Sequence, residues 1–135
     1  MRRWLLGGLV VATIAVGAVR LGLAQKPGEA KPNLGKLRHI VLFKFKDGTA
    51  AQDIKTIEDS FRALPTKVPQ IIDFEWGTDV SVENLSQGFT HCFVVTFQDA
   101  DGRAVYLPHP AHQECVELMR PHLDKVLVID YVAKE

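Results

Sequence analysis

The sequence predicts an α+β fold whose strands and helices follow in the order β-α-β-β-α-β. Three observations lead to this prediction. Apolar and polar residues alternate in short segments, which is the period of a half-buried strand. Segments between them repeat apolar residues every three or four positions, which is the period of a helix packed on a core. Of the 135 residues, 47% are hydrophobic and 24% are charged, a balance typical of a single globular domain.

The first part of the domain reads as a strand followed by a helix. Residues 37–45 alternate in character and predict the strand. One face of it carries Leu37, His39, Val41, Phe43 and Phe45. Thr49 and Gln52 have the spacing of a capping box, and apolar residues then recur at helical spacing. A helix is therefore predicted over about residues 50–64, with Pro65 at its end.

The second part supplies the remaining strands and a second helix. Strands are predicted at residues 72–77, 90–97 and 125–133, where β-branched and aromatic residues gather. A short helical segment at 99–106 and a helix at about 110–121 connect the last two strands. The apolar stripe of that helix consists of Ala111, Cys115, Leu118 and Met119. This order is the ferredoxin-like split βαβ arrangement, in which helices cover one face of an antiparallel sheet.

The face of the sheet turned away from the helices is also apolar. It carries alternate residues of the last strand together with Ile40, Leu42, Cys92, Val94 and Thr96. A face of this character is too apolar to be left in water, so a second subunit is its natural cover. The sequence therefore predicts a homodimer whose two sheets pack face to face.

The first 24 residues read as an export signal. Arg2 and Arg3 form a positive start, and residues 4–19 are uncharged and mostly apolar. Gly22-Leu23-Ala24 then offers the small residues of a cleavage site. This apolar run of 16 residues is short for a membrane span, which needs about 20. We predict cleavage after Ala24 and export to the periplasm or the medium; an uncleaved membrane anchor is the alternative.

The rest of the chain shows no sign of nucleic-acid binding. Three of the 16 basic side chains lie in the predicted signal, so 13 basic residues stand against 16 acidic ones and form no basic patch. Residues 25–36 lack apolar periodicity and predict a flexible linker ahead of one domain at 37–133. Cys92 and Cys115 match no zinc motif. Their strand and helix positions place them on opposite sides of the sheet, which argues against a disulfide.

One short stretch concentrates side chains that can carry chemistry. It is Tyr106-Leu107-Pro108-His109-Pro110-Ala111-His112. His39 and His91 lie on the strand faces turned toward the helices, so both are expected to converge with the tyrosine and the last histidine of the stretch in a cavity between sheet and helices. A metal site built from His109 and His112 is a weak alternative, because no carboxylate of suitable spacing accompanies them. We predict no metal and no cofactor.

This set of residues suits proton transfer beside a carbonyl group. A histidine titrates near neutral pH and can take a proton and return it. A tyrosine hydroxyl in a dry cavity can donate a hydrogen bond to a developing enolate oxygen. Each residue also has an ordinary structural role open to it, as a buried histidine bonded to the backbone, a core tyrosine or a surface histidine at a helix start. No nucleophilic serine motif, phosphate loop or dinucleotide fingerprint is present.

Five segments, in this order along the chain, resemble the stress-responsive A/B barrel (Dabb) domain family. They are Arg38-His39-Ile40-Val41-Leu42-Phe43-Lys44-Phe45-Lys46, Phe74-Glu75-Trp76-Gly77, Gly88-Phe89-Thr90-His91, His109-Pro110-Ala111-His112 and Val128-Ile129-Asp130-Tyr131. The resemblance covers residues 37–133 and implies a dimeric α+β barrel. One member of the family is a plant polyketide cyclase that closes a linear polyketide by aldol condensation.

The resemblance also implies roles for individual residues. The catalytic histidine of that cyclase falls on His112 and its catalytic tyrosine on Tyr106, while two further pocket histidines fall on His39 and His91. Three functions stay open at this point. The protein is a cyclase-like or lyase-like enzyme that needs no cofactor, a non-catalytic module that binds an apolar small molecule, or a structural dimer that protects under stress.

Overall fold

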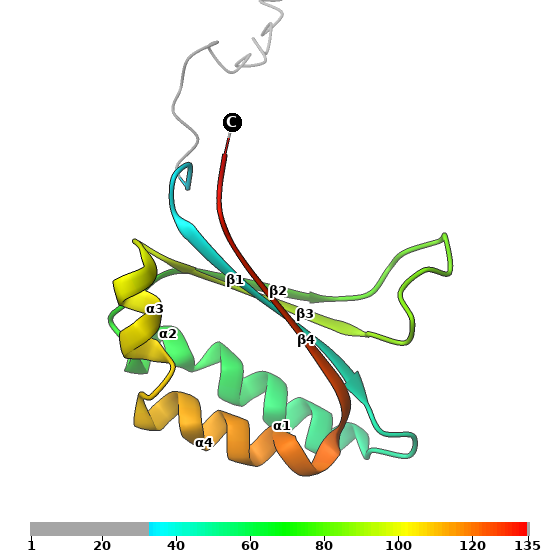
Figure 1. The fold of residues 1–135 in the computed structure, drawn as a ribbon. Helices are drawn as coiled ribbons and strands as arrows, with labels where there is room; N and C mark the ends of the chain where they lie inside the picture. The colour runs from blue at the N-terminus through cyan, green and yellow to red at the C-terminus, as the bar shows by residue number, and fades with distance from the viewer. Residues whose placement is uncertain (1–32, 135) are drawn as a thin grey trace, which may run out of the picture.

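The computed structural model of the protein describes residues 33–134. They form one four-stranded sheet with all of the helices on one of its faces (Figure 1). The predicted signal peptide and most of the predicted linker lie outside these residues. The elements in chain order are β1 (Leu37–Phe45), α1 (Ala51–Arg62), α2 (Leu64–Lys67), β2 (Ile71–Thr78), β3 (His91–Phe97), α3 (Ala100–Tyr106), α4 (Pro110–Met119), the 3-10 helix η1 (Arg120–His122) and β4 (Leu123–Val132).

The sheet has the strand order β2-β3-β1-β4, and every neighbouring pair is antiparallel. This confirms the predicted ferredoxin-like α+β fold. The register pairs His39 with Val95 on β3 and with Asp130 on β4. Directly paired residues of antiparallel strands point to the same face. The register therefore carries Asp130 onto the helix-covered face, beside His39.

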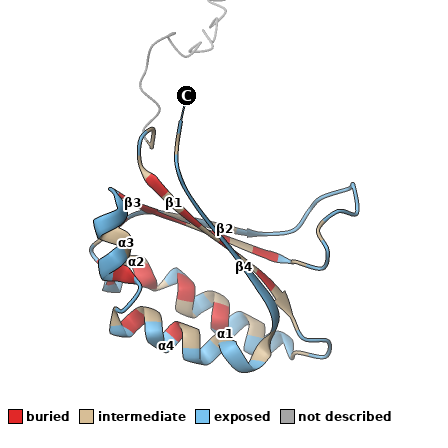
Figure 2. Ribbon diagram, viewed as in Figure 1, coloured by how far each residue is buried: buried red, intermediate tan, exposed pale blue. Residues whose placement is uncertain are grey.

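The alternation of β1 makes the core. Its odd-numbered residues from Leu37 to Phe43 are buried under the helices, as the burial colours of Figure 2 show. Phe43, Phe61 and Phe93 join sheet to helix, with ring centroids 4.7 to 5.3 Å apart. Aromatic pairs at such distances add about 0.5–1.5 kcal/mol each to the free energy gained from burial. This cluster fixes α1 against the middle of the sheet.

Local details at the first helix differ from the sequence prediction. The Thr49 hydroxyl donates to the carbonyl of Lys46 at 2.7 Å and does not cap the helix, whose N-cap Ala50 has no side-chain acceptor. The predicted capping box is therefore wrong. Pro65 also does not end the helical region, because it sits in the first turn of α2, where a missing N–H does no harm.

The two helix starts beside the sequence stretch rich in histidine are capped by their own residues. Asp99 accepts hydrogen bonds from the backbone N–H groups of Asp101 and Gly102, which starts α3. His109 accepts from the backbone N–H of Ala111 at 3.2 Å, and Pro110 begins α4. The turn between α3 and α4 is thereby fixed, and it sets the positions of Tyr106 and His112.

The outer face of the sheet carries the apolar residues that the sequence predicts. Leu127, Ile129 and Tyr131 pair with the even-numbered residues of β1 and are 39%, 51% and 46% exposed. Cys92 lies on this face, half-buried, whereas Cys115 is buried under α1 with its thiol 2.6 Å from the Ser60 hydroxyl. Both thiols are free.

The ends of the described region are joined to each other. The backbone N–H of Gly35 donates to the carbonyl of Ala133, and the N–H of Ala133 donates to the carbonyl of Lys36. The last residues of the predicted linker are therefore held against the end of β4. Among residues 33–134, no helix has the length and apolar character that crossing a bilayer requires.

Candidate functional site

A cavity of about 310 Å³ lies between the sheet and helices α3 and α4. Its size is at the lower end of the range for small-molecule sites. Most of the residues that line it are apolar. The residues that line it are His39, Val41, Phe61, Tyr106, Leu107, His112, Val116, Met119, Val126, Val128 and Asp130. Three of the four residues that the sequence predicts as site residues are among them.

Tyr106, the last residue of α3, is fully buried, and its hydroxyl has no hydrogen-bond partner. An unsatisfied buried polar group costs about 1–3 kcal/mol. Burial, with a smaller contribution from the Cys115 thiol, raises the pKa of the Tyr106 phenol well above its usual value. The phenol therefore stays protonated across the physiological range and acts as a hydrogen-bond donor that lacks an acceptor.

His112, in the first turn of α4, lies next to that tyrosine with ring centroids 4.2 Å apart. Its Nδ1 is 2.9 Å from the carbonyl oxygen of Leu107. A carbonyl only accepts, so Nδ1 carries the proton and Nε2 holds the free lone pair of the neutral ring. Burial lowers the pKa of His112, and the nearby His39 and His109 lower it further, while the hydrogen bond to Leu107 works in the opposite direction. His112 is thus a neutral base at neutral pH.

His39 extends this group from the sheet side. Its ring is 5.9 Å from the ring of Tyr106, and its Nδ1 lies 2.6 Å from the carboxylate of Asp130. The second oxygen of that carboxylate accepts from Arg103 at 2.6 Å. His39 is therefore held in one orientation by a carboxylate that is itself fixed by an arginine. Such carboxylate contacts set which ring nitrogen of a histidine carries the proton.

His91 does not join this group. Its Nε2 is 3.0 Å from Glu58 on α1 and its Nδ1 is 2.9 Å from the hydroxyl of Thr90, so both ring nitrogens are engaged. His91 pairs with Phe43 in the register, four residues along β1 from His39, or roughly 13 Å at the rise of a strand. Of the four residues that were expected to converge, the structure brings three together: His39, Tyr106 and His112. Both histidines point toward the helices, but they lie at different ends of the sheet.

Two polar residues, one lining the cavity and one behind it, were not predicted as site residues from the sequence. Asp130 lies in an apolar strand and Arg103 in a short helix, and 27 positions separate them. The signal for Asp130 was present, because a charged residue at a core-facing position of a strand needs a partner. Arg103 gave no signal, since its contact depends on how α3 packs beside β4. Within the described residues, no cluster of three or more His, Cys, Asp or Glu side chains could hold a metal ion.

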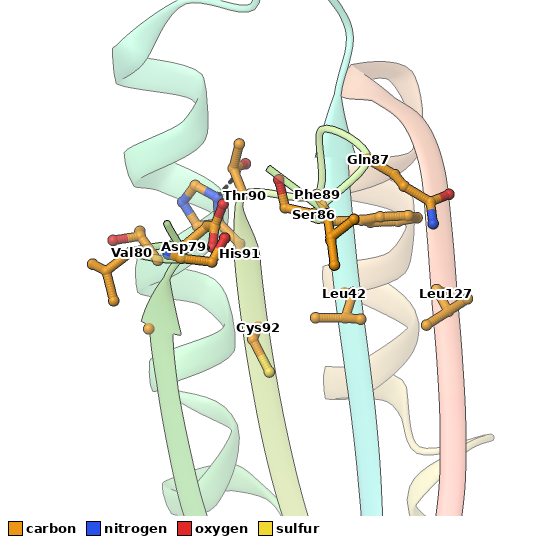
Figure 3. A pocket seen from close by; sticks show the side chains of 14 residues that line it. Leu42, Asp79, Val80, Ser86, Gln87, Phe89, Thr90, His91, Cys92 and Leu127 are labelled. Atoms are coloured by element: carbon orange, nitrogen blue, oxygen red, sulfur yellow. Dashed lines mark hydrogen bonds between the residues drawn. The ribbon is translucent and has the colours of Figure 1, made fainter. Parts of the chain in front are cut away.

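A larger cavity, of about 630 Å³, opens on the outer face of the sheet beneath the loop between β2 and β3. Figure 3 shows Leu42, Cys92 and Leu127 on adjacent strands there, below Phe89 of the loop. Both ring nitrogens of His91 have partners here, and the buried hydroxyl that lacks a partner, that of Tyr106, lines the other cavity. The cavity of His112 and Tyr106 is therefore the better candidate for chemistry.

Fold and site together define a class of protein: a ferredoxin-like α+β domain with a histidine and a tyrosine side by side in a cavity between sheet and helices. The sequence model of the Stress Responsive A/B Barrel Domain matches residues 37–133. The chain belongs to this family.

Individual proteins agree with the assignment. The chain is 42% identical over 97 residues to the stress-response A/B barrel domain-containing protein HS1 of Arabidopsis thaliana. The matched segment covers 72% of this chain and 89% of that protein. It is 29% identical over 99 residues to olivetolic acid cyclase of Cannabis sativa, covering 73% and 98%.

Solved structures show the same fold. Hydroxynitrile lyase from Passiflora edulis superimposes with a TM-score of 0.70 and 27% sequence identity, covering 77% of this chain and 97% of that one. A dimeric ferredoxin-like protein of unknown function from Jannaschia sp. superimposes with a TM-score of 0.64 and 25% identity, covering 72% and 98%.

The lowered pKa of His112 predicts a pH dependence of stability. The unfolded chain takes up the proton near the ordinary imidazole pKa of about 6.5, whereas the folded protein does so only at lower pH. Stability rises with pH wherever the unfolded state binds more protons. The free energy of unfolding of the wild type, relative to a His112→Gln variant, is therefore expected to be highest above pH ~7 and to fall as the pH drops below ~6.5. Chemical denaturation of both proteins across this range measures it, and a difference that grows on acidification would contradict it.

Proposed function

We propose that the protein is a cofactor-independent enzyme that moves a proton at the carbon next to a carbonyl group, in cyclase-like or lyase-like chemistry. The observation that carries the proposal is the unpartnered, buried hydroxyl of Tyr106 beside the neutral base His112 in one largely apolar cavity. A structural tyrosine normally finds a hydrogen-bond partner when it is buried. A substrate oxygen is the acceptor that this arrangement lacks.

The roles follow from the protonation states of the two groups. Nε2 of His112 takes the proton from the carbon beside the carbonyl, and the electron pair of that C–H bond moves onto the carbonyl oxygen. The Tyr106 hydroxyl donates a hydrogen bond to the enolate oxygen that forms. The imidazolium then returns its proton to carbon, to a leaving group, or to the alkoxide oxygen that forms when the enolate carbon attacks a second carbonyl group. His39, held by Asp130 and 5.9 Å from Tyr106 between ring centroids, orients the substrate.

Similar proteins support catalysis in this fold. One relative is named as olivetolic acid cyclase and one solved neighbour as a hydroxynitrile lyase. We extend to this chain the general capacity for cyclase-like or lyase-like chemistry. The family resemblance implies that His91, like His39, is a pocket histidine that binds substrate. Its engagement with Glu58 favours a supporting role instead, holding α1 to the sheet.

Hydrogen–deuterium exchange into ketones tests the proposal without knowledge of the product. The protein is incubated in D2O with acetone, acetophenone and linear methyl ketones, and deuterium beside the carbonyl is followed by NMR. We expect the wild type to accelerate exchange, His112→Ala to abolish the acceleration, and Tyr106→Phe to reduce it about 10²–10³-fold, the usual effect of losing one oxyanion donor.

Two controls separate chemistry from folding. Tyr106→Phe removes only an unpaired hydroxyl, so its free energy of unfolding is expected to equal or exceed that of the wild type. His122→Ala removes a histidine that does not line the cavity and is expected to leave exchange unchanged. Exchange that is no faster than in buffer, together with ketone binding, would favour the alternative of a non-catalytic binding module. Absence of both would favour a structural dimer.

We further propose that the protein is a homodimer assembled through the outer face of its sheet. Leu127, Ile129 and Tyr131 are 39–51% exposed on this face, and they lie beside Ile40 and Leu42 of β1. An apolar face of this kind is a typical association surface. A solved neighbour with the same fold is described as dimeric.

Charged substitutions distinguish this face from others. Ile129→Asp is expected to convert the dimer into a monomer, because a twofold interface would bury the new carboxylate twice without a partner. Val105→Asp provides the matched control, since Val105 is 48% exposed on α3, away from that face. Analytical ultracentrifugation reports the outcome; a dimer that survives Ile129→Asp with unchanged affinity would exclude the outer face.

The export signal in residues 1–24 remains a proposal drawn from the sequence alone. We propose that the protein is exported and cleaved after Ala24. Intact-mass measurement of the protein from the exported fraction of cells that express the full chain tests both parts. A mature protein that begins at Gln25 is expected, whereas a full-length protein in the membrane fraction would establish the uncleaved anchor.

A further inference from the structure

Arg103 joins α3 to β4 beside the candidate site. Its guanidinium donates to Oδ2 of Asp130 at 2.6 Å, and Oδ1 of the same carboxylate lies 2.6 Å from Nδ1 of His39. Each oxygen of this carboxylate thus has a different partner. The side chains of Arg103 and Asp130 are both 30% exposed, whereas that of His39 is 7% exposed. The contacts therefore run from two partly exposed side chains to a buried imidazole.

The helical period places Arg103 on the same side of α3 as the tyrosine of the site. Tyr106 follows Arg103 at the i+3 position, so the two side chains are neighbours on the helix surface. Tyr106 lines the cavity that holds His112, and Arg103 does not. Arg103 can therefore act on the chemistry of this cavity only through Asp130 and His39.

The carboxylate of Asp130 determines which ring nitrogen of His39 faces a ligand. An ionised carboxylate only accepts hydrogen bonds, so Nδ1 of His39 carries a proton. In the neutral ring, Nε2 then holds a lone pair and accepts hydrogen bonds. In the protonated ring, Nε2 donates instead, and the ring brings a positive charge into the cavity that it lines. The charge of His39 therefore decides what it offers to a substrate.

The charges around His39 balance only when Arg103 is present. Val95, its partner on β3, carries no charge. A carboxylate alone beside an imidazole favours the charged imidazolium. A guanidinium on the other oxygen of that carboxylate compensates its negative charge. The titratable and charged groups that face His39 from β4, α3 and α4 are Asp130, Arg103, Tyr106 and His112.

A positive charge on His39 would oppose the uptake of a proton by His112. The charge interaction with His39 is already one of the causes that lower the pKa of His112. Two imidazolium rings in one largely apolar cavity repel each other, because little solvent screens them. His112 therefore works as a base only while His39 is uncharged.

We propose that Arg103 is a positioning residue that keeps His39 uncharged by sharing the carboxylate of Asp130, so that His112 is free to accept the substrate proton. Arg103 acts through Asp130 and touches neither the base nor the tyrosine donor. This inference rests on the proposed function, because the base that Arg103 serves is His112.

NMR of the imidazole nitrogens tests the charge on His39 directly. Two-bond 1H–15N correlation spectra follow the protonation of both ring nitrogens against pH, and a His39→Gln variant assigns the signals. In Arg103→Met, His39 is expected to take up its second proton at a higher pH than in the wild type, because Asp130 then has no other positive partner. In Asp130→Asn the displacement is expected in the opposite direction, because the guanidinium remains and the carboxylate is gone. A displacement in the same direction in both variants, or none in either, would overturn the proposal.

The pH profile of deuterium exchange tests the consequence for catalysis. With acetone as the probe, Arg103→Met is expected to lower the catalysed rate about tenfold near neutral pH and to recover it at higher pH, where His39 loses the additional proton. Arg103→Lys keeps the positive charge and is expected to restore the wild-type profile. A purely structural role would instead lower the rate equally at every pH, and this result would overturn the proposal.

Arg62→Met is the matched control for the loss of an arginine. Arg62 also donates to an aspartate, Asp59 at 3.3 Å, but it lies at the end of α1 and lines neither the site cavity nor the one on the outer face. The variant is expected to leave the protonation of His39 and the exchange profile unchanged. Equal effects of Arg62→Met and Arg103→Met would contradict the specific role of Arg103.

The two measurements separate this inference from the proposed catalysis. Protonation of His39 that moves to higher pH in Arg103→Met, in a protein whose wild type shows no exchange, would support the control of charge by Arg103 and overturn the catalytic function. Exchange by the wild type, with protonation of His39 unmoved in Arg103→Met, would leave the catalytic function standing and overturn the role of Arg103.

Discussion

The structure depends on the position of β1 in the middle of the sheet, paired on both sides. A central strand forms hydrogen bonds with two neighbouring strands, and its side chains alternate strictly between the two faces of the sheet. The odd-numbered residues build the aromatic core under the helices, and the even-numbered ones build an apolar outer face. His39 belongs to the first set. The alternation in β1 therefore fixes the core, places His39 in the candidate site and leaves an apolar outer face on the sheet.

The candidate site is formed where regular structure leaves a gap. The turn between α3 and α4 is closed by a histidine cap and by Pro110, and the carbonyl of Leu107 at that turn fixes the ring of His112. The buried tyrosine beside it has no partner, so the fold retains an unsatisfied donor where a packed core would not. Local conflict of this kind between stability and structure is characteristic of functional sites. The unpaired hydroxyl of Tyr106 distinguishes this cavity from the larger one on the outer face.

The elements could be predicted from the sequence because each rests on a short-range period. Alternation in β1 and helical spacing in α1 gave those elements within a residue or two. The capping box at Thr49 failed because the hydroxyl found a closer acceptor in the preceding turn. Within the site, Tyr106 and His112 could be paired from the sequence, since they lie six positions apart on a closed turn. Asp130 and Arg103 could not, because their contacts join residues distant in the chain.

The sequence by itself determined the order of strands and helices, the two faces of each strand and the residue types available for acid–base chemistry, because these follow from local periodicity and composition. Only the tertiary structure decided which of those residues meet. It placed His39 in the cavity with Asp130 and Arg103 behind it, and it placed His91 against Glu58 at the other end of the sheet. The reason is that register between strands and the packing of helices are set by the whole core, and a shift of a few residues along a strand moves a side chain by more than the width of a site.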